Sequence, residues 1–178
     1  MSAMMVFTFI GADKPGLVEK LAQTVGSHGG NWLESRMSEL AGQFAGIVSV
    51  AVSEAQLPAL RAALLELSGE EMTIVVAAAD HRGIGDDCRY LRLSIVGNDR
   101  PGIVREVSTA LAARRINVLD MNTTISSAPM SGAPLFRAVA RIQVPKALDL
   151  AELSKELDAI AEALTVEIDL EESSLARQ

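Results

Sequence analysis

The chain has 178 residues, 49% of them apolar and 22% charged, and its 16 Lys and Arg against 23 Asp and Glu give a formal net charge of -7. This composition excludes a disordered chain, and an acidic surface without a basic cluster argues against direct nucleic-acid binding. With Cys88 as the only cysteine and no run of roughly 20 apolar residues, we expect no intrachain disulfide, no cysteine-rich metal cluster, no membrane contact and a cytoplasmic location.

The first half of the chain predicts a strand, a helix, two strands, a helix and a strand, in that order. Residues 4–10 alternate with the period of two that is typical of a strand. Leu17, Leu21 and Val25 follow at helical spacing, and Gly29 with Gly30 ends that helix. The remaining elements of this half are strands at 31–39 and 43–53, a helix over the leucines at 57–67 and a strand at 72–79.

The second half predicts the same succession of elements. They are a strand at 90–97, a helix at 101–114, strands at 117–126 and 135–144, a helix at 149–162 and a strand at 164–170. We expect Pro15 and Pro101 in the first turn of their helices, where a missing N–H costs nothing. The predicted domains therefore cover 1–79 and 90–171, with a polar linker at 80–89 and a polar tail at 172–178.

An internal repeat supports this division. Residues 9–18 read FIGADKPGLV and residues 95–104 read IVGNDRPGIV, and an insertion around 126–134 lengthens the second copy. The repeat matches Gly11 with Gly97, Asp13 with Asp99, Lys14 with Arg100, Gly16 with Gly102 and Asn31 with Asn117.

The order βαββαβ, found twice, predicts an α+β protein. Each copy is expected to form a ferredoxin-like domain, with an antiparallel sheet of four strands and two helices on one face. Domains of this size bury a small core, so we expect them to pack side by side or to form a homodimer.

The repeated loop has groups that complement an α-amino acid. A helix N-terminus suits a carboxylate, and the acidic side chain before it, Asp13 or Asp99, can accept from an ammonium group. Asn31 or Asn117 can both donate and accept, and so can bridge the two ends of such a ligand. The residues alone leave open a structural interpretation, in which the aspartates cap the helix and the asparagines form a turn.

In these loops the sequence resembles the ACT domain family. The motif Gly-x-Asp-Lys/Arg-Pro-Gly-Leu/Ile-Val after a first strand, with Asn-x-Leu-Glu/Asp at the second, carries the resemblance in both halves. The tandem layout, with no catalytic or DNA-binding domain attached, is similar to the glycine-cleavage-system transcriptional repressor group.

The resemblance implies a non-enzymatic regulator that binds an amino acid, glycine or serine foremost, where two ACT domains meet. It also implies control of glycine-cleavage genes through a separate DNA-binding regulator protein. Carried over residue by residue, the ligand-binding positions are Gly11, Asp13, Lys14, Gly16, Asn31, Gly97, Asp99, Arg100, Gly102 and Asn117. Serine-binding members of the family often have Asn in place of Asp13 and Asp99.

Other features point to no further chemistry. His81, Asp86, Asp87 and Cys88 include metal-ligand types but lack a paired spacing, and no cofactor motif is present, so neither a metal nor a cofactor is predicted. His28 is expected to cap a helix C-terminus.

The alternatives to the amino-acid sensor are a protein-interaction or dimerisation module without a ligand, an RNA-recognition module and a small-phosphate hydrolase. Low aromatic content and negative charge oppose RNA recognition, and no anion-binding arginine loop is present for the hydrolase.

Overall fold

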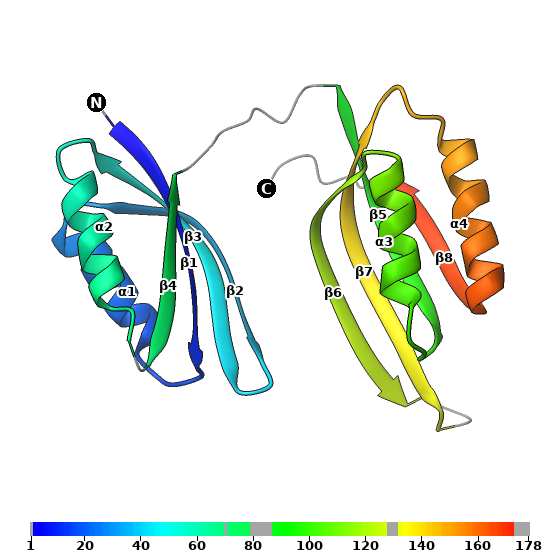
Figure 1. The fold of residues 1–178 in the computed structure, drawn as a ribbon, viewed down its shortest axis with the longest axis horizontal. Helices are drawn as coiled ribbons and strands as arrows, with labels where there is room; N and C mark the ends of the chain where they lie inside the picture. The colour runs from blue at the N-terminus through cyan, green and yellow to red at the C-terminus, as the bar shows by residue number, and fades with distance from the viewer. Residues whose placement is uncertain (1, 70, 79–86, 128–131, 173–178) are drawn as a thin grey trace. The chain divides into compact units, whose positions relative to one another are not determined.

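The computed structural model describes residues 2–69, 71–78, 87–127 and 132–172 (Figure 1). The chain divides into two compact units, Met1–Arg82 and Gly83–Gln178. Within the described residues, no helix has the length and apolar character needed to cross a membrane.

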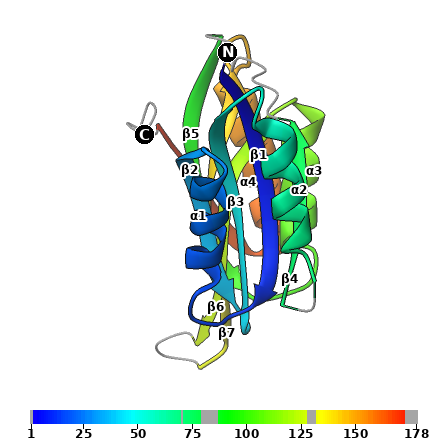
Figure 2. The same ribbon diagram turned by 90° about the vertical axis from the view of Figure 1, so that its left-hand side faces the viewer.

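The first unit has the predicted βαββαβ order. Its elements are β1 (Ser2–Ala12), α1 (Leu17–Ser27), β2 (Asn31–Leu40), β3 (Gln43–Ser53), α2 (Leu57–Glu66) and β4 (Met72–Ala78). The strands form one antiparallel sheet in the order β2-β3-β1-β4, and both helices cover the same face of it (Figures 1 and 2).

The second unit repeats this fold. Its elements are β5 (Cys88–Asn98), α3 (Ile103–Ala113), β6 (Asn117–Ser127), β7 (Pro134–Pro145), α4 (Leu150–Leu164) and β8 (Val166–Glu172). The strand order is β6-β7-β5-β8, again antiparallel. The predicted fold class, two ferredoxin-like ACT-type domains, is therefore confirmed.

Each unit has a core of its own between the sheet and the helices. In the first unit, Phe7 of β1 is buried in a cluster with Leu21 of α1 and Leu64 of α2. In the second, Leu93 of β5 is buried in a cluster with Leu157 of α4. Alternate strand residues face the helices because successive side chains of a strand point to opposite faces.

The structure corrects the predicted helix starts. Pro15 and Pro101 lie before the helices, which begin at Leu17 and Ile103. The residues that precede these helices, Gly16 at φ 94° and Gly102 at φ 107°, are left-handed, a conformation that glycine adopts without steric cost. A helix cannot continue backwards through such a residue, so the prolines lie in the turn.

Other boundaries differ by a few residues. The second unit begins its first strand at Cys88, and α4 continues to Leu164, so that β8 starts later than predicted. Residue 79, residues 80–86 of the predicted linker, residues 128–131 of the insertion and the tail from 173 lie outside the described residues.

Thr165 ends α4 in the left-handed region at φ 54°. A β-branched residue there is strained, so Thr165→Gly is expected to raise the free energy of unfolding of the second unit by about 1 kcal/mol. Thr124→Gly in strand β6 is the control and should lower it, because glycine weakens a strand. Chemical denaturation measures the free energy of unfolding of both variants. If Thr165→Gly loses as much stability as Thr124→Gly, the backbone of Thr165 is not strained.

Candidate functional site

The loops before α1 and α3 have the same backbone geometry. Each ends in a left-handed glycine, and each is fixed to the neighbouring hairpin by one backbone hydrogen bond. The Asp13 N–H donates to the Gly42 carbonyl at 2.9 Å, and the Asp99 N–H donates to the Pro134 carbonyl at 2.9 Å. The repeated sequence therefore gives a repeated loop.

The helix N-termini behind these loops are uncapped by side chains. The first helical hydrogen bonds are Lys20 N–H to the Gly16 carbonyl at 3.0 Å and Glu106 N–H to the Gly102 carbonyl at 2.9 Å. The earlier N–H groups of each first turn have no helical partner and carry the positive end of the helix dipole. The interpretation of Asp13 and Asp99 as helix caps is wrong; both side chains are exposed.

The glycines that end β1 and β5 have a packing role. A Cβ on Gly11 would lie 2.5 Å from the Glu71 carbonyl oxygen, and one on Gly97 would lie 2.9 Å from Cα of Val166. In both units the neighbouring edge strand approaches the glycine too closely for any side chain. The adjoining edge strand of the same sheet therefore occupies the space that a side chain would need.

The basic residues of the two loops have different surroundings. Lys14 is exposed, and together with Lys20 it lies near Glu71. The hydrogen bond from Lys20 Nζ to Glu71 Oε2, at 2.5 Å, is the main cause that lowers the pKa of Glu71. Arg100 is half-buried, and its Nη2 donates to the Ala163 carbonyl at 2.8 Å, so it joins the second loop to the end of α4.

Asn31 and Asn117 lie at the opposite end of their sheets from these loops. Asn31 is opposite Ala51 of β3, which pairs with Met4 of β1, whereas Gly11 lies seven positions further along β1. At about 3.3 Å per residue, this separation is about 23 Å.

The second unit has the same register, in which Asn117 is opposite Gln143 and Gln143 opposite Tyr90. A β-bulge follows the asparagine in both copies, between Trp32 and Glu34 and between Val118 and Asp120. Within one unit, the structure therefore does not bring the asparagine to the loop.

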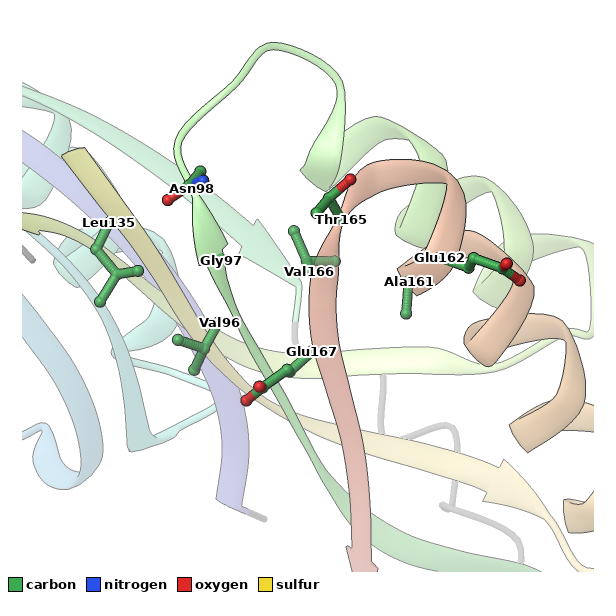
Figure 3. A pocket seen from close by; sticks show the side chains of 9 residues that line it. All are labelled: Val96, Gly97, Asn98, Leu135, Ala161, Glu162, Thr165, Val166 and Glu167. Carbon is green, nitrogen blue, oxygen red and sulfur yellow. The ribbon is translucent and has the colours of Figure 1, made fainter. Parts of the chain in front are cut away.

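Equivalent pockets lie beside the close-approach glycine in both units. The pocket of the second unit has a volume of about 530 Å³ and is bounded by the ends of β5 and α4 and the starts of β7 and β8 (Figure 3). Its polar lining residues are Asn98, Glu162, Thr165 and Glu167. A pocket of about 350 Å³ in the first unit includes Gln43, Glu71 and Thr73. Of the predicted ligand-binding residues, Gly97 lines the pocket of the second unit and Gly11 lines that of the first.

Sequence reasoning missed these polar lining residues because they differ between the copies. At the start of the edge strands, for example, the lining residue is Thr73 in the first unit and Glu167 at the equivalent position of the second. Only the register of the edge strands against the central strands places them beside the glycines.

The remaining candidates have local roles. The His28 ring nitrogen Nδ1 lies 2.9 Å from the Thr24 carbonyl at the end of α1, in agreement with the predicted capping. Of the residues considered for a metal, His81 and Asp86 lie outside the described part of the chain. The described residues contain no group of three or more potential metal ligands.

Comparison with protein families finds the ACT domain twice, at residues 3–77 and at residues 91–162. A UPF0237 protein from Streptococcus mutans is 32% identical over 83 residues, which are 47% of this chain and 88% of that protein. The UPF0237 protein of Methanosarcina mazei is 30% identical over 86 residues, 48% of this chain and 87% of that protein.

Two of the solved structures similar to this chain align over nearly its whole length. An unknown protein from Galdieria sulphuraria has a TM-score of 0.83 and 30% identity, and the match covers 97% of this chain and 99% of that one. A "putative glycine cleavage system transcriptional repressor" has a TM-score of 0.69 and 19% identity, over 96% of this chain and 97% of that one. At 19% identity, the likeness to the second structure shows a shared fold and no more.

Proposed function

Because the chain belongs to the ACT domain family and has two of these domains in tandem, we propose that this regulatory protein is non-enzymatic and binds a small amino acid. The proposed sites are the loops at Asp13–Gly16 and Asp99–Gly102. The observation that carries the proposal is their matching backbone geometry, with an uncapped helix N-terminus next to an exposed carboxylate in each copy.

The charges of each loop suit the two ends of an amino acid. The unpaired N–H groups at the start of α1 or α3 would receive the carboxylate, and the Asp13 or Asp99 carboxylate would accept from the ammonium group. Glycine and serine are small enough to leave both contacts in place, and they are the first ligands to test.

The asparagines can take part only if a second ACT domain supplies them. The separation of about 23 Å along the strand is far greater than the length of a small amino acid. A ligand held at one loop would thus meet Asn31 or Asn117 from another domain, which is why the proposal includes assembly of ACT domains at the ligand.

We further propose that the amino acid alters contact with a separate DNA-binding regulator of glycine-cleavage genes. The fold shared with the structure named for a repressor of that system supports this role. The net charge of -7 also favours contact with a protein over contact with DNA.

A second candidate is an interaction module that has no small-molecule ligand. The packing roles of Gly11 and Gly97 favour it, because they explain part of the repeated motif without a ligand. The two candidates differ in one measurable property, which is saturable binding of an amino acid.

A thermal-shift titration with glycine and serine tests the first candidate. Ligand at 100 times its dissociation constant should stabilise the protein by about 2.7 kcal/mol. Asp13→Ala combined with Asp99→Ala should weaken binding at least tenfold, whereas Asp158→Ala, an exposed acid on α4, should leave it unchanged. If no common amino acid shifts the melting temperature, the result would favour the interaction module without a ligand. If the double substitution leaves binding unaffected, the two loops are not the binding sites.

A further inference from the structure

Strand β4 lies at an edge of the first sheet. It is the last strand in the order β2-β3-β1-β4, and no other strand of the described chain pairs with its outer side. Its sequence, MTIVVAA, has no charge and no proline. Natural proteins usually protect an edge strand with charges, proline or a bulge, because an open edge pairs with other strands.

The equivalent strand of the second unit is protected by charge. Thr8 is opposite Val75 in the first sheet, and the matching Ser94 is opposite Asp169 in the second. The same correspondence places Glu171 of β8 where β4 has Ala77. Two copies of β8 side by side would bring carboxylates together and repel, whereas two copies of β4 would not.

Backbone hydrogen bonds show which groups of β4 point outward. The Ile74 N–H donates to Ser68 Oγ at 2.9 Å, and the Met72 carbonyl accepts from the Gly69 N–H at 2.9 Å. Ile74 and Met72 therefore direct their backbone groups away from β1. In an antiparallel ladder this direction alternates from residue to residue. The backbone N–H and carbonyl groups of Val76 and Ala78 therefore also point away from β1.

The loop at Ser68 and Gly69 covers only the first part of this edge. Beyond it, the Ile74 carbonyl, both backbone groups of Val76 and the Ala78 N–H have no partner in the described part of the chain. These groups form a short open ladder at the C-terminal end of β4.

We propose that β4 pairs with β4 of a second copy of this chain, antiparallel and with the two-fold axis at Val76. The two Val76 residues then exchange two hydrogen bonds. The Ile74 carbonyl of each copy accepts from the Ala78 N–H of the other, which adds two more. This register is self-complementary: it uses the open groups and leaves the Ile74 N–H with Ser68.

Apolar side chains flank this ladder on both faces of the sheet. Val75 is 59% exposed on the face without helices, and Leu65 of α2, which packs beside β4, is 43% exposed (Figure 1). Both would be covered on pairing. A contact over the five residues Ile74–Ala78 is about 16 Å long and, at about 20 Å deep, buries about 320 Å² per copy. This is well below the roughly 800 Å² of a standard interface, so the dimer should be weak and dissociate at micromolar concentrations.

This contact does not depend on amino-acid binding. It uses one edge of the first sheet, while Asn31 lies on β2 at the other edge. Failure of the ligand titration would leave the dimer prediction intact, and loss of the dimer would leave the loop sites intact.

Sedimentation equilibrium of the full chain without ligand tests the proposal. Val75→Asp with Ala77→Glu gives β4 the side chains that β8 has at the same positions, and should raise the dimer dissociation constant at least tenfold with an unchanged circular dichroism spectrum. Asp169→Ser in β8 is the matched control and should leave the constant unchanged. A monomeric wild-type chain at several hundred micromolar, or a dimer equally stable in the β4 variant, would overturn the proposal.

Disulfide trapping tests the register. In a Cys88→Ser background, Val75→Cys and Ala77→Cys are made in separate chains, since the proposed axis places residue 75 opposite residue 77 of the other copy. Directly opposite, non-hydrogen-bonded residues have Cα atoms about 4.5 Å apart, within disulfide range. The mixture should form a mixed disulfide much faster than either chain alone. Equal rates would contradict the register.

Discussion

Leu64→Ala is expected to lower the free energy of unfolding of the first unit by about 2–5 kcal/mol. The Leu64 side chain is 0% exposed and lies in the cluster that joins α2 to the sheet. Its truncation removes buried apolar surface and leaves a cavity that a closely packed core fills only in part. Urea denaturation of the full chain, followed by tryptophan fluorescence, measures the change, because Trp32 packs against this core.

The neighbouring residue supplies the control. Leu65 is the same residue type on the same helix but is 43% exposed, so Leu65→Ala removes far less buried surface. We expect a change of at most about 0.5 kcal/mol, as for surface substitutions, measured at a concentration where the chain is monomeric. Equal losses in the two variants would contradict the described orientation of α2.

Gly11→Ala should destabilise the first unit by about 1–3 kcal/mol, although alanine is the smallest possible replacement. The added Cβ would lie 2.5 Å from the Glu71 carbonyl oxygen and 3.1 Å from Cβ of Met72. The Glu71 carbonyl belongs to the backbone directly before β4 and cannot move aside as a side-chain end can, so the start of β4 would have to shift from β1. The measurement is the same denaturation midpoint, with circular dichroism to follow the sheet.

Gly26 provides the opposite case in the same unit. It lies in α1, and a Cβ there would meet nothing within 4 Å. Gly26→Ala should stabilise the unit by about 0.5–1 kcal/mol, because alanine favours a helix and restricts the unfolded chain. Destabilisation by Gly26→Ala, or none by Gly11→Ala, would show that the packing around these glycines is incorrectly described.

The elements and their order could be predicted from sequence because each depends on a local pattern. Alternation in β1 and helical spacing of Leu17, Leu21 and Val25 identified the strand and the helix, and the internal repeat confirmed both in the second half. The helix starts were wrong because Pro15 is compatible with either a turn or a first helical turn. The left-handed Gly16 decides between them.

The composition of the candidate loops was likewise determined by the sequence, since the shared Asp, Pro and Gly lie within a few residues of each other. Sequence could not show that Asn31 lies about 23 Å from Gly11 along the strand direction. Nor could it show that the Glu71 carbonyl leaves no room for a side chain at position 11. It also could not show that β4, which has no charged residue, lies at a sheet edge, as the charged strand β8 does in the second unit. These properties depend on strand order and register, which contacts between residues far apart in the chain decide. A repeat fixes the local conformation of each copy, whereas only the folded sheet determines which strand ends and edges meet.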